Sequence, residues 1–234
     1  MSITELVFIT AQSDPQVRKE LSTKLPDALS GVFSGLPKLE SLYIASNFGI
    51  PGEDGGSQDD ICLLLKWQDI SGFDSFIKST NFAAFKGSML PYLTGPADIH
   101  LYESLEEMPV RMEVDSPHLH IMKSHPNVAN TQPGQISRTS VEDQWKDFIE
   151  QCRLVSSANG SLIGSFNGLG LRKDNSAFFG ATLWKDHEAK EAKTIHLTLS
   201  DSAIKQHLQR LQEVTGTSKW VHFLMRIDQV ALDE

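Results

Sequence analysis

Four short stretches in the first half of the chain are predicted to be strands, and in the first of them apolar and polar side chains alternate, which is the pattern of a strand with one buried face. These stretches are residues 3–10, 42–48, 61–67 and 99–103. The stretch 61–67 is apolar on both faces, so we expect it at the centre of a sheet.

Two helices are predicted between these strands. Asp14 and Pro15 start the first, because an aspartate caps free N–H groups of the first turn and proline suits the first helical position. Apolar residues then recur every four positions as far as Leu25. The second helical segment spans residues 73–90, is rich in phenylalanine and is predicted to break near Thr80. The order is therefore strand, helix, two strands, helix, strand.

The second half of the chain repeats this order. We predict strands at residues 119–122, 162–171, 177–184 and 220–227, and a short extra strand at 194–199. One helix begins at Ser140 and another runs over residues 202–216. The stretch 125–139, rich in Pro, Gly and Asn, is predicted to be either a lid over a pocket or a disordered segment.

Two motifs recur in the same order in the two halves. A Trp-x-Asp step ends the third strand of each half, at Trp67 and at Trp184, 117 residues later in a chain of 234. His100 and His222, 122 residues apart, lie within the last strand of each half. This recurrence indicates a tandem duplication. We divide the chain into a first unit at 1–105, a linker at 106–117 and a second unit at 118–234.

Each half is predicted to be a ferredoxin-like βαββαβ unit whose helices cover one face of a four-stranded sheet. The other face still carries apolar side chains, and packing two such faces together buries both. The predicted fold class is therefore α+β, with tandem ferredoxin-like repeats forming a single-chain dimeric α+β barrel. Because fusion makes this association intramolecular, we expect that the protein can remain a monomer.

Residues 63–93, LLLKWQDISGFDSFIKSTNFAAFKGSMLPYL, and the ADIHLYE that follows soon after resemble the antibiotic-biosynthesis-monooxygenase type of dimeric α+β barrel. The resemblance is good over the first unit and fainter over the second. Members of this family include cofactor-independent oxygenases, polyketide cyclases, isomerases, haem degraders and proteins of no known activity, so the resemblance implies the fold and leaves the reaction open. The tryptophan that lines the pocket of the oxygenases matches Trp67 and, through the repeat, Trp184. Phe73 stands near the aromatic hydroxyl that some of the oxygenases use. Lys86 stands where haem-degrading relatives carry their iron-ligating histidine, so the resemblance does not extend to haem.

Composition and charge exclude several classes of function. The formal net charge is −9 and the sequence shows no Lys/Arg cluster, which argues against binding to nucleic acid. The longest apolar runs are far shorter than a membrane span requires, and the N-terminus lacks the basic region of a signal peptide. Cys62 and Cys152 are expected to be buried free thiols. A cytoplasmic protein without nucleic-acid or membrane partners fits these features best.

Histidines on the predicted strands are the candidates for chemistry. His100 and Tyr102 alternate with Ile99 and Leu101, so we expect the first two to point into the barrel, with Tyr102 contacting a substrate. By the same reasoning His222 is expected to point inward. His118 and His120 share one face of the strand that should pair with the one carrying His222.

Imidazoles suit general acid–base catalysis, so His100, His118, His120 and His222 are the predicted catalytic residues. The same side chains could instead hydrogen-bond to neighbours without chemistry, and a His-x-His pair with a third histidine could bind a metal. The two tryptophans could stack on an aromatic substrate or fill the core at a strand end.

The sequence favours an enzyme of secondary metabolism that acts on a small aromatic or polyketide-like substrate with no cofactor and no bound metal. It would be a cyclase, isomerase or lyase using histidine acid–base catalysis, or a monooxygenase. The alternative is a non-catalytic ligand-binding or stress-response barrel. A cavity lined by apolar groups with a few converging His or Tyr side chains would favour the enzyme.

Overall fold

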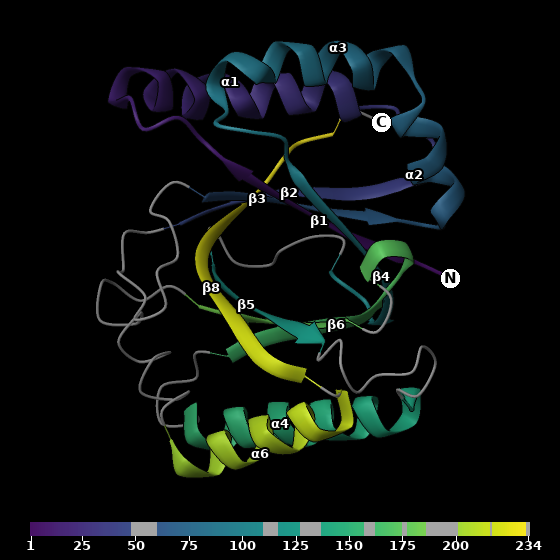
Figure 1. Ribbon diagram of the computed structural model, residues 1–234, viewed down its shortest axis with the longest axis vertical. Helices are drawn as coiled ribbons and strands as arrows, with labels where there is room; N and C mark the ends of the chain where they lie inside the picture. The colour runs from purple at the N-terminus through teal and green to yellow at the C-terminus, as the bar shows by residue number, and fades with distance from the viewer. Residues whose placement is uncertain are drawn as a thin grey trace.

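The computed structural model describes residues 1–47, 60–109, 117–126, 137–156, 162–174, 177–185, 201–215 and 217–232. Within these residues, eight strands form a barrel that lies between two layers of helices (Figure 1). The first half consists of β1 (Ile3–Thr10), α1 (Pro15–Phe33), β2 (Leu39–Asn47), β3 (Asp60–Trp67), α2 (Ile70–Ile77), α3 (Thr80–Met89), η1 (Leu90–Tyr92) and β4 (Asp98–Glu106). The second half consists of β5 (His118–Pro126), α4 (Arg138–Ser156), β6 (Leu162–Gly170), η2 (Arg172–Asp174), β7 (Phe178–Trp184), α6 (Ser202–Thr215) and β8 (Thr217–Gln229).

The helices begin where their capping residues predict. Asp14 Oδ1 accepts the backbone N–H groups of Gln16 and Val17 at 2.7 and 3.1 Å, with Pro15 as the first residue of α1. The predicted break in the phenylalanine-rich segment is confirmed, because the Ser79 hydroxyl caps a separate helix, α3. The predicted extra strand at 194–199 and most of the predicted lid at 125–139 lie outside the described residues.

The strands close into a barrel in the order β1-β3-β2-β8-β5-β7-β6-β4, and every pairing is antiparallel. Each half supplies four neighbouring strands, with its last strand beside its first, as in a ferredoxin-like sheet. The halves join along β2–β8 and along β4–β6. The predicted fold, tandem ferredoxin-like units that form a dimeric α+β barrel within one chain, is confirmed.

The pairing register confirms one of the two predicted repeat matches. Trp67 lies opposite Ile3 on β1, and Trp184 lies opposite His118 on β5, so the two tryptophans occupy equivalent positions. Ile3 of β1 therefore corresponds to His118 of β5, which is 115 residues later in the chain. The same difference of 115 relates every other residue of β1 to its equivalent on β5.

The second predicted match, between His100 and His222, is wrong by one residue. His100 lies opposite Leu6 on β1. The equivalent of Leu6 on β5 is Ile121, which lies opposite Phe223 on β8. Phe223 therefore stands at the position of His100, and a one-residue shift along a strand moves a side chain to the other face of the sheet.

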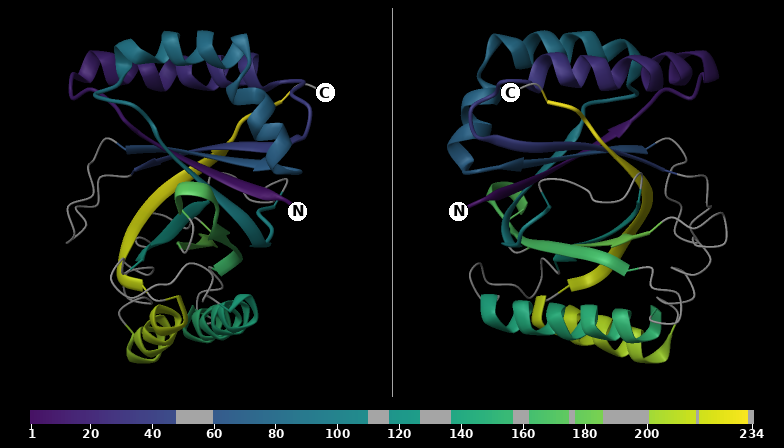
Figure 2. Two further views of the ribbon diagram at one scale, coloured as in Figure 1. Left: turned by 45° about the vertical axis from the view of Figure 1, so that its right-hand side comes forward. Right: turned by 180° about the vertical axis from the view of Figure 1, so that it is seen from behind.

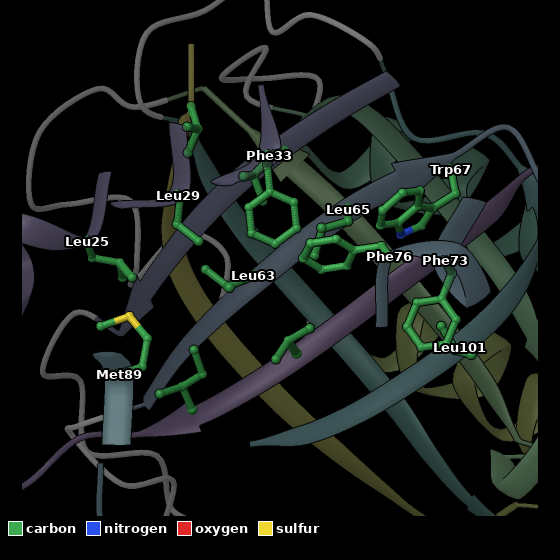
Figure 3. Packing of buried hydrophobic residues seen from close by; sticks show 14 of the residues in the cluster. Leu25, Leu29, Phe33, Leu63, Leu65, Trp67, Phe73, Phe76, Met89 and Leu101 are labelled. Carbon is green, nitrogen blue, oxygen red and sulfur yellow. The ribbon is translucent and has the colours of Figure 1, made fainter. Parts of the chain in front are cut away.

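Three apolar cores hold the layers together. One lies between the first sheet and helices α1–α3, and Figure 3 shows its aromatic part around Phe33, Phe76 and Trp67. A second fills the barrel, and the third lies between the second sheet and helices α4 and α6. Figure 2 shows the two helical layers on opposite sides of the barrel. Among the described residues, no helix is long and apolar enough to cross a membrane.

The segments that follow β8 and β4 are buried in two of these cores. After β8, Val230 is buried in the core under α1–α3, and its N–H donates to the Leu42 carbonyl at 3.0 Å. After β4, Met108, from the predicted linker, is buried in the barrel core. The Tyr43 hydroxyl donates to the next carbonyl, that of Pro109, at 2.8 Å. Val230 therefore ties the end of the second half to the first half beyond the strand pairs, and Met108 packs in the barrel core between them.

Candidate functional site

The alternation of side chains along β4 brings His100 to the barrel interior. Leu101 belongs to the core under the helices, whereas Tyr102 belongs to the barrel core. His100 shares the face of Tyr102, with ring centroids 6.4 Å apart, and is only 6% exposed. The predicted inward orientation of both residues is therefore confirmed.

Two carboxylates hold the imidazole of His100. Its Nδ1 lies 2.5 Å from Asp174 Oδ1, and its Nε2 lies 2.6 Å from Asp98 Oδ2. Asp174, from the short helix η2 of the second half, is itself positioned by the N–H of Leu101, which donates to its other oxygen at 3.2 Å. Asp174 thus holds the ring from one side, and the Nε2 side is turned toward Asp98, whose side chain is 56% exposed.

Lys123 on β5 completes this group from across the barrel. Its Nζ lies 2.5 Å from His100 Nε2, 3.9 Å from Asp98 Oδ2 and 5.5 Å from the centre of the Phe8 ring. Burial lowers the pKa of Lys123, although the charges of Asp98 and Asp174 oppose this shift. We call the side chains of Asp98, His100, Lys123 and Asp174 the His100 cluster.

The charges of the cluster are arranged around its exposed carboxylate. Burial works against the ionised form of Asp98, but hydrogen bonds from Lys173 and His100 and the charge of His100 lower its pKa overall. Lys173 Nζ donates to Asp98 Oδ1 at 2.7 Å, so Asp98 joins the buried imidazole to a cation at the surface.

Tyr102 adds a polar group with no partner. Its hydroxyl is fully buried and makes no hydrogen bond within the described part of the chain. Burial, reinforced by the charges of Asp174 and Asp98, raises the pKa of Tyr102. Its ring lies 4.5 Å from that of Phe179, between centroids. Because buried hydroxyl groups nearly always have a partner, this one is available to a ligand that reaches it.

The two tryptophans lie outside the His100 cluster. Trp67 and Trp184 are fully buried in the cores under the helices of their halves. Trp67 Nε1 donates to Glu5 Oε2 at 2.7 Å, and Trp184 Nε1 donates to Thr182 Oγ1 at 2.8 Å. Of the two roles that the sequence left open for them, the structure shows the role in the core.

The histidines of β5 also lie away from the cluster, which corrects the predicted group of three. Leu119 and Ile121 are in the barrel core, so His118 and His120 lie on the opposite face, toward α4 and α6. His120 is 2% exposed. The register pairs His222 with Met122, and the side chain of His222 is outside the described part of the structure.

Sequence reasoning missed three members of the cluster. Asp98 and Lys123 carried a weak signal, because each is a charged residue on the face of a strand that otherwise points into the barrel. Asp174 carried none, since it lies in a turn of the other half, 74 residues from His100. Among the described residues, no group of three or more His, Cys, Asp or Glu side chains could hold a metal ion.

A surface hollow of about 370 Å³ lies elsewhere, between α1 and α3. It is lined by Ala28, Gly31, Val32, Asn81, Ala84, Phe85 and Ser88. None of the residues that the sequence singled out for chemistry is among them.

These features define a single-chain dimeric α+β barrel with a partly buried polar cluster between its halves. No known family profile and no curated protein matches the chain. Solved structures do match it along its whole length. An anthrone oxidase-like protein has a TM-score of 0.66 at 10% identity, over 100% of this chain and 95% of its own. A proposed monooxygenase of Fusobacterium nucleatum has a TM-score of 0.58 at 10% identity, over 100% and 94%.

A proposed monooxygenase of Lactobacillus acidophilus is similar as well, with a TM-score of 0.52 at 9% identity over 99% of this chain and 95% of its own. Identities this low show a shared fold and do not assign a reaction. The fold expected from the resemblance to antibiotic-biosynthesis monooxygenases is thereby confirmed.

Proposed function

We propose that this protein is a small-molecule enzyme in which His100 transfers a proton to and from an aromatic or polyketide-like ketone, without a bound organic cofactor. The observation that carries the proposal is the setting of His100. Its ring is buried, fixed by Asp174 at 2.5 Å and flanked by the unpartnered hydroxyl of Tyr102.

Asp174 makes Nε2 the working nitrogen of His100. A carboxylate that holds Nδ1 fixes the tautomer and the orientation of the ring and stabilises its protonated form. The partner on the Nε2 side, Asp98, has a side chain that is 56% exposed. A substrate that displaces Asp98 would therefore meet Nε2 directly, while Asp174 keeps the ring in place.

Tyr102 supplies the second group that such chemistry needs. When a proton leaves the carbon next to a carbonyl, negative charge develops on the carbonyl oxygen, and a hydrogen-bond donor aimed at that oxygen lowers the barrier. The His100 and Tyr102 rings lie 6.4 Å apart between centroids, so one small ketone could contact both. His100 Nε2 would take the carbon-bound proton, and Tyr102 would donate to the enolate oxygen.

The fate of the enolate separates the reactions that remain open. Return of the proton to another carbon gives an isomerase, and attack on an internal carbonyl gives a cyclase. Reaction with O2 gives an oxygenase, which for anthrone yields anthraquinone and one water. The anthrone oxidase-like neighbour, with the same fold, supports anthrone as the first substrate to test.

The test uses anthrone and 2-tetralone in D2O, with carbon-bound deuterium measured by NMR and O2 uptake by electrode. The wild-type protein should catalyse exchange on at least one ketone. His100→Asn should reduce the rate by about 10²- to 10⁴-fold, which is the usual contribution of a positioned acid–base group. His207→Asn, on helix α6, serves as the matched control and should keep the wild-type rate. No exchange by the wild type, or full exchange by His100→Asn, would refute the proposal.

The packing of the barrel favours a second candidate, the non-catalytic barrel. Tyr102, Phe166 and Phe179 are fully buried there, and Phe166 and Phe179 have ring centroids 5.9 Å apart. In that case the His100 cluster would serve to bind the two halves to each other. His100→Asn would then lower the unfolding temperature, and the wild type would show no exchange on either ketone.

A further inference from the structure

Among the described residues of the barrel, Lys66 is buried and Lys123 is partly buried, and the two have opposite surroundings. Lys66 lies opposite Thr4 of β1, and Lys123 lies near Phe8, toward the other end of that strand. Lys66 Nζ lies 3.0 Å from Glu40 Oε2 and 2.8 Å from Glu107 Oε2, and its side chain is 5% exposed. Burial disfavours its charge, but these two carboxylates raise its pKa overall, so Lys66 is a firmly held ammonium.

Lys123 has no comparable pair of carboxylates. Its side chain is 13% exposed, and the nearest carboxylate oxygen among its recorded ion pairs, on Asp98, is 3.9 Å away. The ionisable groups that act on it are Asp98 from β4, Asp174 and Lys173 from η2, Cys62 from β3, and His100, whose Nε2 is 2.5 Å away. The charges of Asp98 and Asp174 therefore offset the desolvation of Lys123 only in part, whereas the two carboxylates at Lys66 more than offset it.

The contacts of His100 bear on the role of Lys123. Nδ1 of the ring lies 2.5 Å from Asp174 Oδ1, and Nε2 lies 2.6 Å from Asp98 Oδ2 and 2.5 Å from Lys123 Nζ. Lys123 Nζ is therefore in hydrogen-bond contact with a ring nitrogen rather than with a carboxylate. An ammonium group can only donate to Nε2, whereas a neutral amine can donate to it or accept from it and carries a lone pair.

We infer that Lys123 is a nucleophilic amine that forms a Schiff base with an aldehyde or ketone at the end of the barrel. The lone pair of Nζ attacks the carbonyl carbon, and the resulting carbinolamine loses water as the C=N bond forms. His100 supplies a proton to the departing hydroxyl, so that one carbonyl and one amine give one imine and one water. The Phe8 ring, 5.5 Å from Nζ, gives the carbonyl compound a flat apolar surface.

This inference rests on the proposed function, because both use the His100 cluster. It deepens that function by naming a carbonyl compound as the substrate class. It also provides a second route to the enolate chemistry, because an iminium ion acidifies the neighbouring carbon more strongly than the free ketone. The two statements differ in the atom they concern. The proposed function concerns proton transfer by His100 Nε2, and the inference concerns bond formation at Lys123 Nζ.

The experiment traps the imine on the full chain. The protein is incubated with benzaldehyde and sodium cyanoborohydride at neutral pH, and labelled lysines are located by peptide mass spectrometry over time. Lys123 should be labelled faster than Lys66 and than the surface lysines, because a lowered pKa leaves a larger fraction of its side chain as the free amine. Lys123→Met, checked for folding by circular dichroism, should lose the fast phase. His100→Asn should keep Lys123 as the labelled residue but slow its reaction.

The outcomes separate the two proposals. Labelling of surface lysines before Lys123 would refute the inference, even if ketone exchange depends on His100. Rapid labelling of Lys123 together with undiminished exchange by His100→Asn would refute the proposed function and leave the inference standing. If Lys123→Met does not fold, Lys123→Gln provides the same test, because glutamine is polar and uncharged, like the inferred amine, and forms no imine.

Discussion

Glu5 is a carboxyl group inside the apolar core of the first half, and its replacement by glutamine tests the physical reasoning about this core. It lies on β1 between Ile3 and Val7, faces the helices and is 4% exposed. Its Oε2 accepts a hydrogen bond from Trp67 Nε1 at 2.7 Å. Burial raises the pKa of Glu5 to about 7, and the hydrogen bond from Trp67 offsets part of this shift.

This shift links folding to pH with a definite sign. Between the ordinary value of 4.5 and about 7, the folded protein keeps a proton on Glu5 that the unfolded chain has released. The free energy of unfolding therefore falls as the pH rises through this window. The stabilisation is complete below pH 4.5 and lost above about pH 7, and its size is about 3 kcal/mol at 1.36 kcal/mol per pKa unit.

Glu5→Gln keeps the shape of the side chain and removes the titration. The variant should resemble the wild type near pH 4.5 and exceed its free energy of unfolding by up to about 3 kcal/mol near pH 8. Urea unfolding followed by circular dichroism at several pH values measures the difference. Glu150→Gln, at an exposed position of α4, should show no such trend. A wild-type-to-variant difference that stays constant with pH would show that Glu5 does not titrate in this range.

Four further outcomes are expected. Gly180→Ala should cost about 1–3 kcal/mol in urea unfolding, because an added Cβ would lie 2.2 Å from Trp145 Cζ3. Val230→Ala should cost about 2 kcal/mol in the same assay, since Val230 ties the end of β8 to the opposite half. Tyr102→Phe should unfold no more easily than the wild type, because it removes an unpartnered hydroxyl, but should slow ketone exchange about 10²-fold. Light scattering should give the mass of one chain, 26.0 kDa, because the barrel closes within the chain.

Local signals in the sequence were sufficient for the elements and for the fold. The cap at Asp14, the alternation along β1 and β4 and the Trp-x-Asp repeat each depend on neighbours along the chain, and the structure bears them out. The inward position of His100 followed from the same alternation, because Leu101 is the residue that belongs under the helices.

The register of β8, and so the face that it turns toward the barrel, could not be predicted from such local signals. Its sequence, TSKWVHFLMRIDQ, carries apolar residues on both faces, so either assignment of faces satisfies the pattern. Closure of the barrel decides between them, because β8 pairs with β2 as well as with β5, with Ala45 opposite Ile227 and Leu119 opposite Met225. Met225 and Ile227 are in the barrel core, so the odd-numbered positions of this part of β8 face the barrel. The equivalent of His100 is therefore Phe223, one residue after His222.

The same register shows that the strand positions of Asp98, His100 and Tyr102 are not repeated as polar residues in the second half. Asp98, His100 and Tyr102 lie opposite Phe8, Leu6 and Thr4 on β1. The equivalent positions on β8, opposite Lys123, Ile121 and Leu119, are occupied by Val221, Phe223 and Met225, which are all apolar.

Lys123 and Phe8 are themselves equivalent positions of the two halves, and they meet within the barrel at 5.5 Å. One half therefore supplies the histidine and the apolar ring, and the other supplies the amine. Because neither half contains both nitrogen groups, the cluster depends on the fused pair. A trapped carbonyl compound should accordingly reach one molecule per chain, and a second fast-labelling lysine would contradict this division of roles.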